Sequence, residues 1–292
     1  MSYNNISCTD SYGNTGIACG SEKLGYFQKL IWTTEDFEFA SQTLAEDNDE
    51  WQDAINEKKI FPFKNFVSVE PSYEDDVREE LPTGSVIDVR DGKMRETGHS
   101  IMAICEMREH RKFNGKNGRV FLVTTNGYIL GYSPDGVKFK GFTLDTLKVG
   151  LLSGTDGSTS RKVPVYYSLA VPEEFGDYIG AIKPTWAPLD LEGLLNVDME
   201  LSGSASASLV TFTVNLSCSS EEGVAGLVEG DFSFLKSNGD AQTTQTFDEI
   251  GGGVYTFSST AATVSGTLAL KTADAQTTGG YDDSGAITIT IA

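Results

Sequence analysis

The chain has 292 residues, which is enough for two domains that each bury their own core. Its 42 acidic and 22 basic residues give a formal net charge of −20, and this argues against binding of nucleic acid or of an anionic membrane surface, because both depend on Lys and Arg. The first residues do not resemble a signal peptide, and no segment approaches the roughly 20 apolar residues of a membrane span, so we expect folding in the cytoplasm.

The composition changes near residue 200. Beyond that point only Lys236 and Lys271 are basic, and Pro, Trp and His are absent. Ser, Thr, Gly, Ala and Val in alternating runs replace them, which favours short antiparallel strands. We therefore expect three parts: a polar N-terminal arm over residues 1–22, a first β domain over 23–197 and a second over 198–292.

The first domain is expected to begin with a strand over residues 25–34, followed by a helix. Asp47 or Asn48 is a suitable N-cap for that helix, and Lys58 and Lys59 suit its C-terminal end. One face of the helix is apolar and consists of Trp51, Ala54 and Ile55.

An aromatic-rich strand at residues 61–67 leads into a segment with six carboxylates between Glu70 and Glu80, bracketed by Pro71 and Pro82. Prolines and like charges favour an exposed loop or an edge hairpin. Such a segment either is simply solvated or contacts another subunit or lines a lumen. The candidate residues for a contact are Glu70, Tyr73, Glu74, Asp75, Asp76, Glu79 and Glu80.

Residues 85–90 alternate as a strand, and residues 99–113 have a helix-favouring composition. Both histidines, His99 and His110, fall in this expected helix. The charged neighbours of His110 indicate a solvated helix face rather than a catalytic site.

A β-meander is predicted over residues 119–142. Asn126 and Gly127 predict a type I′ hairpin turn, and Pro134, Asp135 and Gly136 predict a second turn. A flexible loop over 151–162, a strand over 163–171 and a segment that covers the domain over 172–188 are expected to follow.

Residues 190–200 are expected to connect the two domains. The second domain has candidate strands at 207–217, 231–236, 252–260, 266–272 and 285–292, and the triplet 251–253 is expected to form a turn or bulge. This strand count over about 90 residues fits an immunoglobulin-like sandwich. The expected fold class is thus mainly β with one or two helices: a β-sandwich or barrel-like domain followed by an immunoglobulin-like β-sandwich.

No group of residues indicates catalysis, because no nucleophile, base and orienting residue can be named together. Adjacent carboxylates at 79–80, 173–174, 221–222 and 282–283 are expected by chance in so acidic a chain. Asp47 and Asp282 lie in acidic clusters that could bind calcium, but neither cluster has the spacing of an EF-hand. We expect no catalytic, cofactor-binding or metal-binding residues, no cofactor, and free thiols at the four cysteines.

The stretch from Val224 to Leu235, followed by GGVYTFSST and SGTLALKT, resembles a bacterial immunoglobulin-like domain. That resemblance covers about a third of the chain. It implies a fold more than a function, since such domains occur on many surface and virion proteins.

The stretch from Cys8 to Gly16, the block from His110 to Phe142 and the following TLDTLKVG resemble structural proteins of phages and prophages of Bacteroidota-type bacteria. The whole plan is similar to that of siphophage major tail proteins. The resemblance implies a homo-oligomer, expected to be hexameric, whose stacked rings contact other virion proteins and conduct DNA without membrane contact. It also implies assembly in the host bacterial cytoplasm and a final location in the virion.

Two alternatives remain open. One is a capsid decoration or head-fibre protein, in which the first domain attaches and the second is displayed. The other is a polysaccharide hydrolase with an accessory immunoglobulin-like domain.

Overall fold

The chain divides into two compact units, unit 1 (Met1–Gly193) and unit 2 (Leu194–Ala292). The boundary lies four residues before the one expected at 197/198, because the first strand of unit 2 already begins at Leu195. The expected arm, residues 1–22, lies outside the described residues. The computed structural model describes residues 25–73, 77–80, 82–83, 86–90, 92–154, 160–176, 178–203, 205–206, 209–217, 219–242, 246–258, 265–276, 278–282 and 285–291.

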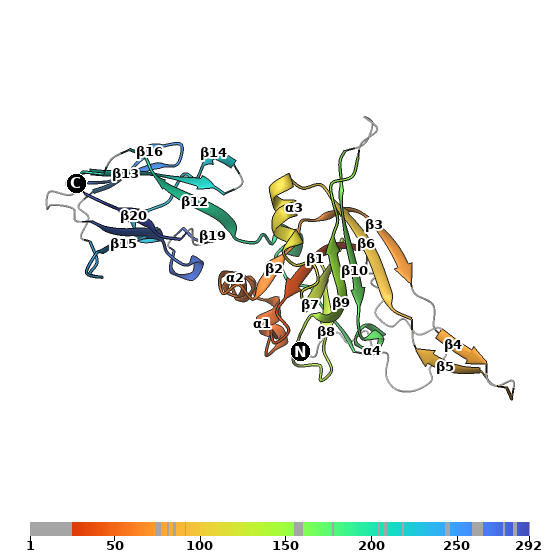
Figure 1. The fold of residues 1–292 in the computed structure, drawn as a ribbon. Helices are drawn as coiled ribbons and strands as arrows, with labels where there is room; N and C mark the ends of the chain where they lie inside the picture. Colours follow the sequence, from red (N-terminus) through yellow and green to blue (C-terminus); the bar gives the residue numbers. More distant parts are fainter. Residues whose placement is uncertain are drawn as a thin grey trace. The chain divides into compact units, whose positions relative to one another are not determined.

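Both units are mainly β, which confirms the predicted fold class (Figure 1). Nine strands of unit 1 form one antiparallel sheet in the order β11-β8-β7-β9-β10-β6-β3, with β1 on the other edge of β7 and β2 on β1. The strands are β1 (Phe27–Thr33), β2 (Ile60–Pro62), β3 (Phe66–Tyr73), β6 (Met94–Ser100), β7 (Arg119–Thr124), β8 (Ile129–Tyr132), β9 (Phe142–Val149), β10 (Val163–Leu169) and β11 (Ile179–Ile182). Strands β4 (Val77–Glu80) and β5 (Val86–Arg90) form a separate two-stranded sheet.

Strands β1 and β7 are buried on both faces. On one face, Leu30, Val120 and Leu122 belong to the main core of the unit, together with alternate residues of β10. On the other face, Phe121 packs against Trp51 of helix α2 (Asn48–Asn56), with ring centroids 5.1 Å apart. This double cover explains why residues 30–32 of β1 and 120–123 of β7 are uninterrupted apolar runs instead of alternating ones.

The predicted helix is confirmed as α2. Asp47 caps it by accepting a hydrogen bond from the Asp49 amide at 3.0 Å, and Trp51, Ala54 and Ile55 are its buried residues. Two five-residue helices were not expected: α1 (Gln42–Glu46), capped by Ser41, and α4 (Pro172–Gly176).

The helix predicted over 99–113 is shorter, because α3 spans Ile104–Arg111. His99 lies in strand β6, opposite Pro164 of β10, so the expectation that both histidines share a helix is wrong. The segment 172–188 also differs from expectation, since it contains α4 and the strand β11, which pairs with β8.

Unit 2 consists of two sheets whose inner faces share one core. Its strands are β12 (Leu195–Leu201), β13 (Leu209–Leu216), β14 (Ser219–Gly223), β15 (Phe232–Lys236), β16 (Thr246–Gly251), β17 (Val254–Ser258), β18 (Gly266–Leu270), β19 (Tyr281–Asp282) and β20 (Ile287–Ile289). One sheet has the order β16-β17-β13-β12-β19, with β14 on β13, and the other has the order β15-β18-β20.

If β12, β13, β15, β16, β17, β18 and β20 are lettered A to G in chain order, the two sheets read DEBA and CFG. This is the strand arrangement of a constant-type immunoglobulin domain. Strand β12 was expected to be a connector. It is instead the first strand of the sandwich, because its alternating Val197 and Met199 are buried in the core.

Cys105, at the start of α3, is disulfide-bonded, so the expectation of free thiols is wrong for this residue. The other three cysteines lie outside the described residues. None of the described helices has the length and apolar character needed to cross a membrane.

Candidate functional site

The acidic segment forms the end of one strand and a hairpin. Glu70 lies in β3 with its side chain 76% exposed, and its carboxylate is 3.3 Å from Nε2 of His99. Tyr73 ends β3 opposite Met94. Glu79 and Glu80 are exposed residues of β4, while the predicted contact residues Glu74, Asp75 and Asp76 lie outside the described residues.

The turn at Asn126 and Gly127 lies where the sequence predicts it, but the type I′ assignment is wrong. Gly127 has a φ of +79°, whereas Asn126 does not have the positive φ that a type I′ turn requires. The Thr124 amide donates to the Tyr128 carbonyl at 2.9 Å, and the Gly127 amide donates to the Thr124 carbonyl at 3.0 Å. The loop therefore has three residues and ends in a glycine bulge.

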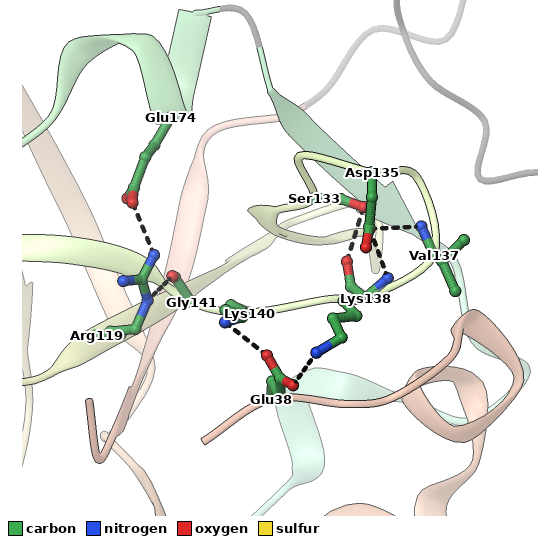
Figure 2. Close-up of polar contacts among 9 residues, drawn as sticks. All are labelled: Glu38, Arg119, Ser133, Asp135, Val137, Lys138, Lys140, Gly141 and Glu174. Atoms are coloured by element: carbon green, nitrogen blue, oxygen red, sulfur yellow. Dashed lines mark hydrogen bonds and ion pairs between the residues drawn. The ribbon is translucent and has the colours of Figure 1, made fainter. Parts of the chain in front are cut away.

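The second turn is held by the Asp135 side chain (Figure 2). Its Oδ1 accepts hydrogen bonds from the amides of Val137 at 2.9 Å and Lys138 at 2.8 Å, and these bonds lower the pKa of the carboxyl group. Ser133 Oγ donates to the Lys138 carbonyl at 2.8 Å, and Gly136 has a φ of +67°. The third strand of the predicted meander is reduced to single bridges at Phe139 and Lys140 before β9 begins.

Glu38 lies beside this turn and binds two lysines from it (Figure 2). Lys138 Nζ is 2.6 Å from Oε1 of Glu38, and Lys140 Nζ is 2.5 Å from Oε2. The hydrogen bonds from Lys138 and Lys140 lower the pKa of Glu38, and the same contact raises the pKa of Lys138. Lys138 is exposed and Lys140 is partly exposed, so these pairs orient the turn more than they stabilise the fold.

Arg119 and Glu174 form an ion pair with side chains only 15% and 10% exposed (Figure 2). Arg119 Nη2 donates to Glu174 Oε1 at 2.8 Å. Thr143 donates to the same carboxylate through its amide at 2.6 Å and its hydroxyl at 2.9 Å. These bonds connect helix α4 to β7 and β9. The sequence offered no signal for this role, since Glu174 was one of several adjacent acid pairs.

Two further polar side chains inside unit 1 have strongly altered pKa values. Burial lowers the pKa of Lys29, which is 3% exposed, to about 8, and its Nζ donates to the Leu189 carbonyl at 2.8 Å. Burial lowers the pKa of His110 to about 4, and its ring stacks on Phe63 with centroids 4.4 Å apart. The predicted solvated position of His110 is therefore wrong.

These contacts fix turns and connect elements, and they do not place a nucleophile beside a base. Among the described residues, no three His, Cys, Asp or Glu side chains gather where they could hold a metal ion. Comparison of the chain with protein families, curated proteins and solved structures finds no match.

Proposed function

We propose that this protein is a virion structural protein, a tail tube subunit whose unit 1 assembles with copies of itself into stacked rings. The observation that carries the proposal is the β4–β5 hairpin. It pairs with no other strand in the described part of the chain, and it exposes Glu79 and Glu80. An isolated two-stranded hairpin is marginally stable in water, so a neighbouring subunit is a natural source of the missing contacts.

Ring formation would also cover the edge strands of the large sheet in unit 1. Among the described strands, this sheet ends at β11, β3 and β2, and unpaired sheet edges otherwise invite uncontrolled aggregation. A closed ring of identical subunits covers such edges with the same contact repeated at each interface. Carboxylates that line the lumen of the ring would repel DNA phosphates, so the genome would pass without adhering.

Unit 2 supports a display role, because it has a core of its own and an immunoglobulin-type strand order. The same observation favours the second candidate, a capsid decoration or head-fibre protein in which unit 1 attaches and unit 2 projects.

Negative-stain microscopy of the purified chain distinguishes the tail tube subunit from the capsid decoration or head-fibre protein. Stacked rings or tubes support the tail tube proposal, and monomers or trimers that bind only to heads support the second candidate. A chain that ends at Gly193 is expected to retain ring assembly, since the first strand of unit 2 begins only at Leu195. Loss of assembly in that truncated chain would contradict the assignment of assembly to unit 1. Cleavage of a glycan without any assembly would overturn both candidates in favour of a hydrolase.

A further inference from the structure

The outward face of helix α3 begins with apolar side chains and ends with basic ones. Ile104, Arg108 and Arg111 follow one another at spacings of four and three residues, so they share one face, and all three are exposed. Met107, at the edge of that face, is buried. Ile104 is 57% exposed, and Ile101, just before the helix, is 49% exposed. Within the described residues, neither Arg108 nor Arg111 forms an ion pair.

This face is basic in a chain whose net charge is −20. Over α3 and its C-terminal cap, residues 104–112, the sequence has three Lys and Arg and two acids. Both acids are already bound: Glu106 by Lys64 at 3.2 Å, and Glu109 by Lys112 at 2.5 Å. The positive charge of Arg108 and Arg111 therefore remains available to a partner.

The complementary charge lies at the other end of β3. Residues 70–90, up to the end of β5, contain seven carboxylates against two arginines, and Glu79 and Glu80 are exposed. The ion pair between Lys64 and Glu106 places α3 next to the start of β3, whereas the hairpin follows its end at Tyr73. Eight residues of strand at about 3.3 Å each separate the two regions by about 25 Å. That distance is too long for an ion pair between groups at the two ends of β3.

We infer that the exposed face of α3 binds the acidic β4–β5 hairpin of a second copy of this chain. The inference rests on the proposed function and names the contact that would join neighbouring subunits. Two different patches meet in such a contact, so repetition leads to a ring or a filament instead of a closed dimer. Ile101 and Ile104 favour a protein over a nucleic acid as the partner, because a phosphate backbone offers no apolar surface to bury them.

The experiment is a charge reversal followed by sedimentation velocity of the full chain. R108E/R111E and E79K/E80K are each expected to weaken self-association at least about tenfold, because like charges would then face each other across the contact. The chain with all four substitutions is expected to associate again, since both signs are exchanged. Raising NaCl from about 0.05 M to about 0.5 M is expected to weaken the wild-type contact, because salt screens exposed charges.

K58E/K59E is the matched control for R108E/R111E, since it lowers the net charge by the same amount at exposed positions after α2 and is expected to leave association unchanged. Failure of the four-substitution chain to associate while the wild type does would overturn the inference. So would a wild type that binds a short DNA duplex through Arg108 and Arg111 without self-association.

Negative-stain microscopy of the wild type and of the two charge-reversal variants distinguishes a failure of this contact from a failure of the proposed function. Rings that form equally well in wild type, R108E/R111E and E79K/E80K would refute the contact and leave the tail tube proposal intact. A wild type that forms no assembly at any concentration would refute the proposal itself.

Discussion

Replacing Glu174 by alanine is expected to destabilise unit 1 strongly. The substitution removes the acceptor of three hydrogen bonds, from Arg119 and from the amide and hydroxyl of Thr143. It also leaves the Arg119 guanidinium, which is 15% exposed, without its counter-charge. Removing one member of a buried ion pair costs about 3–5 kcal/mol of folding free energy.

Tryptophan emission during urea unfolding measures this loss selectively, because Trp32, Trp51 and Trp186 all lie in unit 1. With a urea dependence of about 2–3 kcal/mol per molar, the unfolding midpoint is expected to fall by about 1–2 M. Glu173→Ala is the matched control, since Glu173 is its exposed neighbour in the same helix, and it is expected to change the midpoint little.

A double-mutant cycle tests whether the ion pair itself is the cause. Replacing Arg119 by methionine and Glu174 by leucine together leaves no buried charge, so the double variant is expected to lose less stability than the two single changes added. Equal losses for Glu174→Ala and Glu173→Ala, or simple additivity in the cycle, would refute the role assigned to this pair.

Two more predictions concern groups that the fold places under constraint. Because burial lowers the pKa of His110 to about 4, the unfolded chain binds a proton between about pH 6.5 and 4 that the folded chain does not. Stability therefore falls as the pH drops through this window, by up to about 3 kcal/mol, and His110→Phe is expected to remove that part of the slope in urea titrations at pH 4.5 and 7. An unchanged slope would show that His110 does not carry it. In unit 2, Gly253→Ala places a Cβ 2.6 Å from the Val214 carbonyl oxygen at a φ of +76°, whereas Gly252→Ala, at a φ of +61°, meets nothing within 4 Å. Both are expected to cost about 1–2 kcal/mol for the left-handed backbone, with a further loss only for Gly253→Ala. Calorimetry measures the unfolding of unit 2, and equal losses would contradict the close contact.

Local sequence patterns were sufficient to predict an element where residues close in the sequence determine its conformation. The Asp47 cap and the apolar spacing of Trp51, Ala54 and Ile55 predicted α2, since a cap and one packed face suffice to define a helix. Alternating residues predicted β5, β13, β15, β17, β18 and β20. The change in composition near residue 200 indicated two units.

Contacts between residues far apart in the sequence determined which polar groups are paired or buried and which segments join a sheet. The partner of Glu174 is 55 positions away at Arg119, and Lys29 is anchored by a carbonyl 160 positions away, so neither could be read from local spacing. His99 joins a strand instead of a helix because β10 pairs with it, and Val197 becomes core because β12 pairs with β13. The sequence by itself thus determined the fold class, the two-unit plan and the charge of the hairpin. Only the tertiary structure decided which polar groups are buried, because burial depends on the elements that pack over a residue from elsewhere in the chain.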